Sequence, residues 1–380
     1  MRVLSVFGTR PEAIKMAPLV QRLSRTPGIE SIACVTAQHR EMLDQVLDIF
    51  DIKPDIDLDL MRTNQSLAEV TASIFTHLDP VLKQLKPDWV LAQGDTTTVA
   101  ATALLSYYNQ IKFGHVEAGL RTGDKWQPFP EEVNRMIAAV VADLHFAPTE
   151  RSANNLRKEN VPPEKILVTG NTVIDALLMA AYKPLTPEVQ ALLHKLGMPQ
   201  GETLGSTSNQ PRLILVTAHR RENFGAPLEN ICAALKSLAE TYGDGVHIVY
   251  PVHMNPNVQG PVTQSLGKVP NITLLPPLEY LPLVNVLKRA YLVLTDSGGI
   301  QEEAPSFGVP VLVLREVTER PEGIQAGTLR LVGTDPERIV SETRRLLDDP
   351  EAYQRMAKAV NPYGDGHASE RIVSALLQHS

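Results

Sequence analysis

The stretch WVLAQGDTTTVAATALLSYYNQIKFGHVE, residues 89–117, contains two short apolar runs separated by a longer segment. The runs at 89–93 and 112–117 have the length of buried strands, and the segment between them has the length and composition of a helix. A strand, a crossover helix and a second strand form the unit from which parallel sheets are built. The stretch therefore predicts an α/β fold with a parallel sheet.

The same alternation continues along the chain. We expect further strands near residues 3–8, 31–37, 144–147 and 166–169, and in the second half near 213–217, 247–252, 272–275, 292–295, 309–314 and 329–332. Such apolar strands fit parallel sheets that helices cover on both faces. With 380 residues the chain is too long for one ordinary core and suits two domains. We predict two similar doubly wound domains facing each other across a cleft.

Composition excludes several classes of protein. The net charge is −7 and no basic tail stands out, which argues against nucleic-acid binding. Cys34 and Cys232 are far apart in apolar surroundings, so we expect core thiols in a reducing compartment and no disulfide framework. We see no signal peptide and no run of the ~20 apolar residues that a membrane span needs. We expect a cytoplasmic protein that does not bind membranes.

Motifs for common cofactors are missing from the sequence. Neither the dinucleotide fingerprint G-x-G-x-x-G nor the P-loop G-x-x-x-x-G-K-[ST] follows the first strand, so NAD and ATP chemistry is not expected. The ten histidines show no H-E-x-x-H or comparable ligand spacing, and His253 in YPVHMNP stands alone. We therefore expect neither a metal nor a cofactor.

The first strand runs into FGTRPEAIK, which suits an anion site. Gly8 permits a tight turn and Pro11 suits the first helical position. Arg10 and Lys15 add positive charge beside the unpaired amides of the helix start. The alternative is an ordinary turn from strand to helix.

A second candidate for phosphate binding is TDSGGIQEEAPSFG. A strand ends at Ser297, and Gly298 and Gly299 allow close backbone approach before a helix begins. Carboxylates beside a phosphate would repel it, so we expect one of Glu302 and Glu303 to turn toward sugar hydroxyls. The other would lie on a solvated helix face.

The clearest catalytic signal comes from acidic residues. Asp95 and Glu117 lie at the carboxyl ends of successive predicted strands, where open α/β sheets bind their ligands. Glu131 lies in the first turn of a helix opened by Pro130, and Arg135 follows one turn later on the same face. Each acid alone could be a helix cap, and the last two residues could form a surface pair. Convergence at one sheet edge favours catalysis.

The second half concentrates basic residues along its predicted crevice. LVTAHRREN ends a strand at His219, and Arg220 and Arg221 follow immediately. This gives a titratable imidazole and two guanidinium groups at the end of a strand. Arg315 and Arg320, in LREVTERPEG, follow another predicted strand and could clamp the same phosphates.

Seven segments together resemble the non-hydrolysing UDP-N-acetylglucosamine 2-epimerases. They are FGTRPEAIKMAPLV, TAQHREML, QGDTTT, HVEAGLRTGD, FPEEVNR, TAHRREN and DSGGIQEEAPSFGVPVLVLREVTERPEG. The resemblance implies a glycosyltransferase B-type fold of two Rossmann-like domains with the active site between them, and a homodimer. It also moves the domain boundary from the polar segment 197–211 to residues 170–171, so that domain two is 171–366 and the helix at 367–380 returns to domain one.

The resemblance implies the chemistry and the residues that carry it. Anti elimination of UDP from UDP-N-acetylglucosamine would leave 2-acetamidoglucal, and re-addition would give UDP-N-acetylmannosamine for cell-surface polysaccharide synthesis. Asp95, Glu117 and Glu131 would supply the base and the opposite-face acid, and His219 would contact the leaving phosphate. The implied substrate-binding residues are Arg10, Lys15, Arg135, Ser297, Gly298, Gly299, Glu303 and Arg320.

The family resemblance also implies a regulatory site. Gln38, Arg220 and His253 match positions that hold a second UDP-N-acetylglucosamine as an activator in many members. Glu41 and Asn64 differ from the Gln and the basic residue expected in activator-dependent members, so the strength of activation is open.

Three alternatives stay open. A hydrolysing 2-epimerase usually has an Arg-Ala-Asp-Tyr-Gly-like turn where this chain has Arg10, Pro11 and Glu12. A glycosyltransferase of the same fold would require an acceptor and would not need three convergent acids. A sensor without catalytic activity would keep its biological effect after substitution of Asp95.

Overall fold

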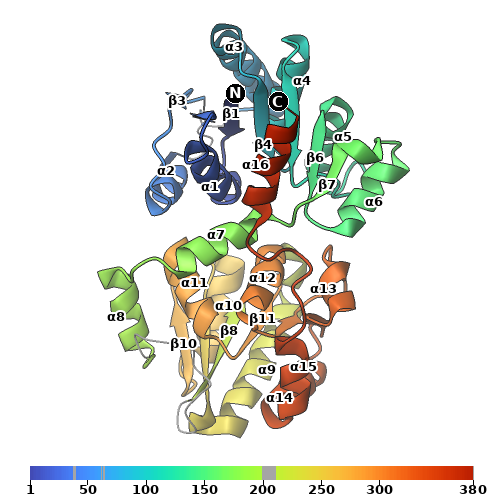
Figure 1. Cartoon of the computed structure of the whole chain (residues 1–380). Coiled ribbons are helices and arrows are strands. Elements are labelled where there is room, and N and C mark those ends of the chain that lie inside the picture. The colour runs from blue at the N-terminus through green and yellow to red at the C-terminus, as the bar shows by residue number, and fades with distance from the viewer. Residues whose placement is uncertain (37–39, 61, 63–64, 199–210, 380) are drawn as a thin grey trace. The chain divides into compact units, whose positions relative to one another are not determined.

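The computed structural model describes residues 1–36, 40–60, 62, 65–198 and 211–379, which form two compact units (Figure 1). Unit 1 contains Met1–Ala180 and Tyr363–Ser380, and unit 2 contains Ala181–Pro362. Most of the polar segment 197–211, and the positions of Gln38 and Asn64, lie outside the described residues.

Unit 1 is built on a parallel sheet of seven strands in the order β3-β2-β1-β4-β5-β6-β7. The strands are β1 (Arg2–Phe7), β2 (Glu30–Val35), β3 (Ile56–Asp57), β4 (Trp89–Gln93), β5 (Lys112–Val116), β6 (Leu144–Ala147) and β7 (Ile166–Val168). The short edge strand β3 was not predicted. Strand order reverses between β1 and β4, which makes the carboxyl ends of these two strands the switch point where such sheets bind ligands.

Helices cover both faces of this sheet, because right-handed crossovers that run in opposite directions along a sheet lie on opposite faces. They are α1 (Arg10–Ser24), α2 (Arg40–Ile49), α3 (Leu67–Leu85), α4 (Thr97–Tyr108), α5 (Glu131–Val141), α6 (Glu150–Lys158), the 3₁₀ helix η1 (Pro163–Lys165), α7 (Thr172–Ala181) and α16 (Ala368–Gln378). On one side α1 packs against α2 and α16, and on the other α4 packs against α3 and α5.

Unit 2 repeats the design with six parallel strands in the order β10-β9-β8-β11-β12-β13. The strands are β8 (Arg212–Thr217), β9 (Val246–Pro251), β10 (Ile272–Leu275), β11 (Leu292–Thr295), β12 (Val311–Val313) and β13 (Leu329–Leu331). Here the order reverses between β8 and β11. The predicted fold class, α/β with two parallel sheets, is confirmed.

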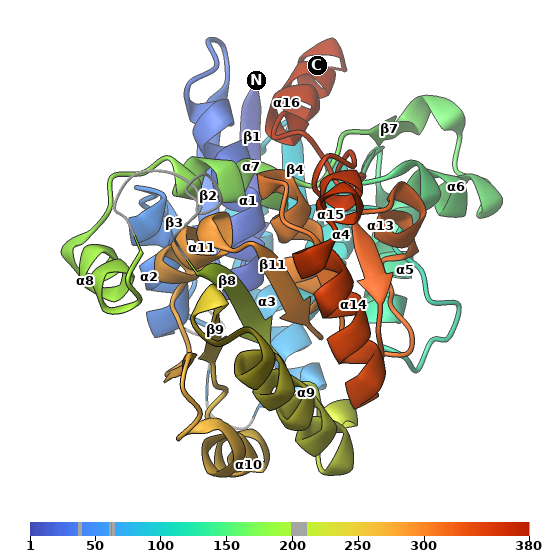
Figure 2. The same cartoon turned by 90° about the horizontal axis from the view of Figure 1, so that it is seen from below.

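The helices of unit 2 are α8 (Pro187–Lys195), α9 (Ala226–Tyr242), α10 (Pro256–Leu266), α11 (Tyr280–Arg289), α12 (Gly298–Glu303), α13 (Pro321–Ala326), α14 (Pro336–Asp348) and α15 (Pro350–Ala357), with 3₁₀ helices η2 (Arg221–Asn223), η3 (Gly243–Gly245) and η4 (Ala304–Phe307). Most of them lie between consecutive strands, whereas α8 precedes β8, and α14 and α15 follow β13. Figure 2 shows α9 and α14 lying side by side, and they contact each other.

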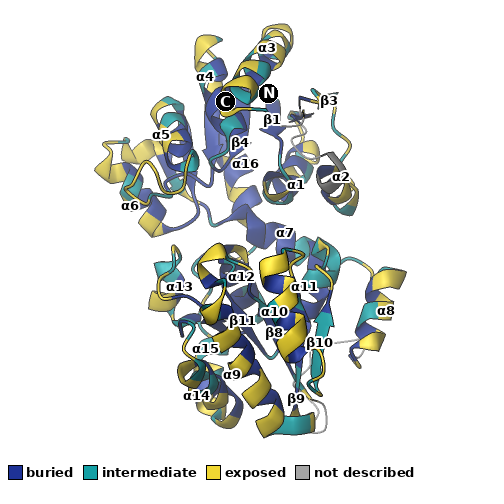
Figure 3. Cartoon of the chain, turned by 180° about the vertical axis from the view of Figure 1, so that it is seen from behind, coloured by how far each residue is buried: buried dark blue, intermediate teal, exposed yellow. Residues whose placement is uncertain are grey.

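Each unit has its own core. The central strands are buried while the outer helix faces are exposed, as the dark blue and yellow segments of Figure 3 show. Cys34 belongs to the core of unit 1 and Cys232 to that of unit 2, and both are free thiols, so the prediction of core cysteines is confirmed. Among the described residues, no helix combines the length and apolarity that crossing a membrane requires.

Two contacts explain where unit 1 ends. The Asn171 amide donates to the Tyr363 carbonyl at 2.7 Å. The Asp175 carboxylate accepts the amides of Ala368 and Ser369 at 3.2 and 2.8 Å, at the start of α16. These bonds tie the first turns of α7 to the returning segment. The units therefore divide after Ala180, later than the expected residue 170, and the returning segment begins at Tyr363 instead of residue 367.

Candidate active site

The turn between β1 and α1 is held by a capping box. Thr9 caps α1, and the Glu12 carboxylate accepts the amides of Gly8 and Thr9 at 3.1 and 2.7 Å. Gly8 is required here for close approach: an added Cβ would lie 2.0 Å from the Thr36 hydroxyl. The glycine expected to permit a tight turn therefore also permits the close approach of this turn to the Thr36 side chain.

Glu12 also reaches the neighbouring turn. Its second carboxylate oxygen accepts the Thr96 hydroxyl at 2.7 Å, so one buried side chain joins the turns after β1 and β4. Burial raises the pKa of Glu12, and the hydrogen bonds from Thr9, Thr96 and Gly8 oppose that rise. Sequence reasoning did not identify this role. The pattern Thr-x-x-Glu at a helix start was the signal that could have found it.

Glu117 follows β5 directly and is almost fully buried. Lys15 on α1 donates to both of its carboxylate oxygens at 2.7 Å, and Asn171 donates at 2.9 Å. Gln93, the last residue of β4, donates to the same carboxylate. The φ of Glu117 is +62°, a left-handed conformation that is uncommon for a residue with a side chain and is concentrated at functional sites.

Asp95 lies just beyond β4, at the same sheet edge. Arg135 on α5 donates to its carboxylate at 2.6 Å, and Asn134 donates to its backbone carbonyl at 2.9 Å. Burial raises the pKa of Asp95; Arg135 opposes this and the Glu117 charge adds to it. The predicted convergence of Asp95 and Glu117 agrees with the pairing of β4 and β5.

A buried histidine supports the turn that carries Asp95. The imidazole of His115 on β5 donates from Nε2 to the carbonyl of Gly94 at 2.7 Å. Burial lowers the pKa of His115 to about 4, so the ring is neutral and can keep one N–H for this bond. His115 stands two residues before Glu117 in HVEAGLRTGD, but nothing in the sequence distinguished it from an ordinary core residue.

The neighbours Glu131 and Glu132 have different surroundings. Glu132 is buried and accepts the amides of Thr122 and Gly123 at 3.1 and 3.0 Å. It also contacts Arg135 at 3.4 Å. Glu131 is half-buried, its charge influences Asp95, and its Oε2 has no hydrogen-bond partner among the described residues. The surface pair considered for Glu131 and Arg135 is replaced by pairs of Arg135 with Asp95 and Glu132.

In unit 2 a buried aspartate organises the switch point. Oδ2 of Asp296, which follows β11, accepts the amides of His219 and Arg220 at 2.8 Å each. It also accepts the Asn223 side-chain amide at 3.0 Å. These donors follow β8, so Asp296 fixes the backbone that carries His219. Sequence reasoning quoted TDSGG without identifying Asp296 as a site residue.

Arg320 lies over the glycine turn after β11. A Cβ on Gly298 would sit 3.6 Å from the Arg320 guanidinium, whereas one on Gly299 would have its nearest neighbour, the Ser297 hydroxyl oxygen, at 4.0 Å. The Nε of Arg320 donates to Glu302 at 2.5 Å. Glycine amides and a guanidinium thus lie together, as a phosphate site requires.

Both acidic residues of α12 are buried. Glu302 is 4% exposed and paired with Arg320, and Glu303 is 8% exposed, so the expected solvated position is wrong for either. Glu303 lies near Tyr280 on α11: burial raises the pKa of this tyrosine well above its usual value, and the Glu303 charge adds to the rise.

Arg315, expected as a second phosphate clamp, is held by two carboxylates. Its Nε donates to Glu222 at 2.5 Å, and its terminal nitrogens donate to Glu319 at 2.7 and 3.1 Å. Burial raises the pKa of Glu319, but the bonds and charge of Arg315 outweigh burial and bring it down to about 2. Arg315 therefore joins two carboxylates of its own unit.

The structure describes two of the three positions assigned to an activator. His253 stacks on His219 with ring centroids 5.5 Å apart and an interplanar angle of 9°. Arg220 is half-buried, and its amide is bound by Asp296. His253, which stood alone in the sequence, thus belongs to the surroundings of His219. Arg10, assigned to substrate binding, is exposed at the start of α1.

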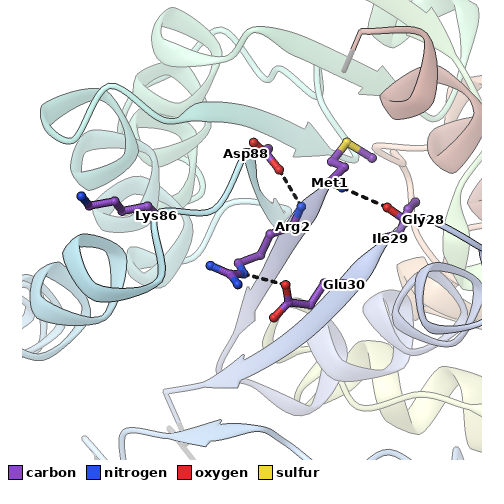
Figure 4. Close-up of a pocket in the computed structure, with 7 residues that line it drawn as sticks. All are labelled: Met1, Arg2, Gly28, Ile29, Glu30, Lys86 and Asp88. Carbon is purple, nitrogen blue, oxygen red and sulfur yellow. Dashed lines mark hydrogen bonds and ion pairs between the residues drawn. The ribbon is translucent and has the colours of Figure 1, made fainter.

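Two surface cavities of unit 1 lie away from these residues. One of about 510 Å³ is lined by Met1, Arg2, Gly28, Ile29, Glu30, Lys86 and Asp88, as Figure 4 shows. Its residues lie at the amino ends of β1, β2 and β4, opposite the edge that carries the acids. The other, about 430 Å³, lies beside α16. Among the described residues, no three side chains of the metal-ligating types form a cluster.

Comparison with known proteins yields consistent matches over the full chain. A family model described as UDP-N-acetylglucosamine 2-epimerase matches residues 21–377. The UDP-N-acetylglucosamine 2-epimerase of Salmonella typhimurium is 56% identical over 380 residues, which is 100% of this chain and 99% of that protein.

Two solved structures match in fold over 100% of both chains. One is the UDP-GlcNAc 2-epimerase from Neisseria meningitidis bound to UDP-GlcNAc, with a TM-score of 0.86 and 48% identity. The other is the enzyme from Methanocaldococcus jannaschii in complex with UDP-GlcNAc and UDP, with a TM-score of 0.76 and 31% identity.

Proposed function

The chain belongs to the UDP-N-acetylglucosamine 2-epimerase family, and we propose that it interconverts UDP-N-acetylglucosamine and UDP-N-acetylmannosamine. In addition to family membership, one observation supports this activity: Asp95 and Glu117 follow the neighbouring strands β4 and β5. Inverting C2 requires one group that removes a proton and another that delivers one to the opposite face. Two acids at one sheet edge meet this requirement.

The reaction proceeds by elimination and re-addition. The C2–H electrons form the C1–C2 double bond while the C1–O bond breaks and its electron pair leaves with UDP. UDP then returns to C1, and a second group protonates C2 from the opposite face. One turnover leaves one acid protonated and the other deprotonated, so the two must exchange protons with water. The hydrogen at C2 of the product is therefore derived from solvent.

The surroundings of the acids suit these tasks. Burial raises the pKa of Asp95, while Arg135 opposes this rise and keeps the carboxylate oriented. Lys15 balances the charge of Glu117 and is an ionisable donor in contact with it, suited to replacing a proton on it. Glu131 is the third candidate, with a buried oxygen that has no partner among the described residues.

Unit 2 supplies the residues for the leaving group. Ser297, Gly298 and Gly299 offer backbone amides to the diphosphate, and Arg320 lies against them. Glu303 is the candidate for the ribose hydroxyls. Preorganised donors at the place where negative charge develops make the largest contribution in reactions of this kind.

The test is to incubate the protein with UDP-N-acetylglucosamine alone in deuterated water and follow C1 and C2 by NMR. We expect UDP-N-acetylmannosamine with deuterium at C2. Free N-acetylmannosamine and UDP as sole products would indicate a hydrolysing enzyme, and no reaction without an acceptor would indicate a glycosyltransferase.

Variants then assign the acids. Asp95→Asn, Glu117→Gln and Glu131→Gln are each offered both sugar nucleotides. A variant that lacks the proton acceptor of the gluco face should fail to eliminate UDP from UDP-N-acetylglucosamine but still release it, with 2-acetamidoglucal, from UDP-N-acetylmannosamine. The acid of the other face should show the opposite pattern. An acid whose loss changes neither rate is not a proton carrier.

We further propose a homodimer formed through α4 and α5. Val133, Met136 and Val140 make an exposed apolar stripe on α5, and Tyr107 and Tyr108 are exposed on the adjacent α4. An exposed apolar patch of this kind is typical of a subunit interface. Sedimentation should show a dimer that Val140→Glu shifts toward monomer.

Two proposals concern the cellular role. A second UDP-N-acetylglucosamine acts as an activator near Arg220 and His253, which a sigmoidal rate curve would reveal.

The product serves cell-surface polysaccharide synthesis from the cytoplasm, a location with which the two free thiols agree.

A further inference from the structure

Asp296 has one oxygen that its backbone contacts do not use. Oδ2 accepts the three N–H groups that follow β8. Oδ1 is buried and has no hydrogen-bond partner among the described residues, and His219 Nδ1 lies 3.6 Å from it. Burying a carboxylate oxygen without a donor is unfavourable. A movement of about 0.7 Å would bring the imidazole N–H to hydrogen-bond distance.

The His219 ring is also fixed from a second direction. His253 stacks on its face, and His253 Nδ1 accepts the Asn255 amide at 3.1 Å. With Nδ1 toward Asp296 and one face against His253, the ring presents Nε2 as the nitrogen for a ligand. The side chain of His219 remains 41% exposed, so Nε2 is accessible.

The charges around His219 oppose one another. Burial, the largest effect, together with His253 and Arg220 brings the pKa of His219 below its usual value, although the Asp296 charge opposes this fall. Asp296 is the one contributor that favours the imidazolium ion. Without Asp296, the imidazolium would be less favourable. The imidazolium is the form in which Nε2 carries a proton for the ligand while Nδ1–H still donates a hydrogen bond.

From this geometry we infer that Asp296 is a positioning residue for His219. It orients Nδ1–H toward its carboxylate and stabilises the imidazolium that forms when Nε2 takes up a proton from water beside the substrate diphosphate. The inference rests on the proposed function. When the C1–O bond breaks, the electron pair goes to the diphosphate oxygen, and Nε2–H of the imidazolium donates to that oxygen. The Asp296 carboxylate accepts from Nδ1–H throughout, as the aspartate does in an Asp–His pair of a hydrolase.

The variant Asp296→Asn tests the role without removing the backbone contacts. The amide oxygen can accept the same three N–H groups, so its NH₂ group faces His219 Nδ1. Nδ1 must then accept, which places the proton of the neutral ring on Nε2. We expect ¹⁵N NMR of the wild-type imidazole to show the Nδ1–H tautomer and the variant to show the Nε2–H tautomer, with the resonance assigned by its loss in His219→Gln.

The same variant should change titration and rate. Loss of a charge within about 4 Å should lower the pKa of His219 by about one to three pH units. The kcat should fall by roughly 10²–10⁴-fold, the usual contribution of a positioned acid or base. The double variant Asp296→Asn with His219→Gln should be no slower than His219→Gln alone, because the first residue acts through the second.

Asn223→Ala is the matched control, since it removes one donor to Asp296 and leaves the charge in place. It should keep the Nδ1–H tautomer. An unchanged tautomer and pKa in Asp296→Asn, a tautomer switch in Asn223→Ala, or additive losses in the double variant would each overturn the inference. The NMR readout needs no turnover, so it is independent of the test of the proposed function. The proposed function fails only if the wild-type protein does not epimerise the sugar nucleotide.

Discussion

Replacing Gly8 with alanine tests how the turn that carries Arg10 is built. The new Cβ would lie 2.0 Å from the Thr36 hydroxyl oxygen, 3.2 Å from that of Thr98 and 3.3 Å from the Thr36 Cβ. The two hydroxyls are hydrogen-bonded to each other at 3.2 Å in a buried position. The hydroxyl of Thr36 must therefore rotate away, which breaks this bond, or β1 must shift.

The magnitude follows from these two effects. Overpacking a core typically destabilises by about 1–3 kcal/mol, and the lost hydrogen bond adds about 1 kcal/mol. We expect Gly8→Ala to reduce the free energy of unfolding by about 2–4 kcal/mol. For a domain of 150–250 residues this corresponds to a fall in Tm of roughly 4–15 °C. Thermal unfolding followed by circular dichroism measures it, and epimerase turnover should fall because Arg10 is displaced.

A second substitution makes the reasoning refutable. Thr36→Ala removes the oxygen at 2.0 Å, so Gly8→Ala should have a smaller effect in the Thr36→Ala background than in wild type. Gly260→Ala, in α10 with no heavy atom within 4 Å of the new Cβ, controls for the residue change and should stabilise by about 0.4–1 kcal/mol. A wild-type Tm for Gly8→Ala, or strictly additive effects in the double variant, would refute the steric account.

Four further changes probe the two sites. Arg135→Gln removes the charge that lowers the pKa of Asp95, so the limb of the kcat/KM profile that Asp95 titrates should move to higher pH. Glu132→Ala should destabilise by about 2–3 kcal/mol in denaturant unfolding, because it removes the buried acceptor of the Thr122 and Gly123 amides and a carboxylate partner of the buried Arg135. Glu131→Ala, by contrast, should change stability little, because Glu131 is half-buried, and its turnover tests Glu131 as the third candidate for a proton carrier. Gly298→Ala adds a Cβ at ordinary contact distance, so Tm should hold while UDP affinity in calorimetry falls by about tenfold or more if phosphate sits on that amide.

The fold followed from the sequence because buried parallel strands have a strong local signal. The run at 89–93 is apolar except for Gln93, the run at 112–117 carries Phe113 and Val116 in its middle, and both form strands of the sheet. The edge strand β3 has two residues, Ile56–Asp57, and a strand that short leaves no pattern to detect. The position at which the units divide depends on bonds from residues 171 and 175 to a segment almost two hundred positions later. No local pattern encodes such bonds.

The residues of the site divide in the same way. Asp95 and Glu117 could be found because their positions follow from strand ends alone. The hydrogen-bond partners of these acids could not be predicted. Arg135 donates to Asp95 although Glu131 is closer to it in the sequence. Arg315 and Arg320 look equivalent in LREVTERPEG, yet Arg315 meets Glu222 and Glu319. Which arginine faces a ligand depends on the positions in the fold of carboxylates that are distant in the sequence.

The two units solve one structural problem in the same way. At a switch point two turns leave the sheet in opposite directions, and the amides of those turns have no strand to pair with. In unit 1 the buried Glu12 accepts the amides after β1 and the Thr96 hydroxyl after β4. In unit 2 the buried Asp296, after β11, accepts the amides of His219 and Arg220 after β8.

A carboxylate suits this position because it only accepts, and its two oxygens can serve several donors at once. It also places a fixed negative charge behind each turn. In unit 1 that charge lies behind the helix start of Arg10 and in unit 2 behind His219, two basic residues expected from the sequence to contact the substrate. A neutral residue could satisfy some of these amides but could not stabilise the positive charge that His219 gains on protonation, which is why Asp296→Asn should separate scaffolding from catalysis.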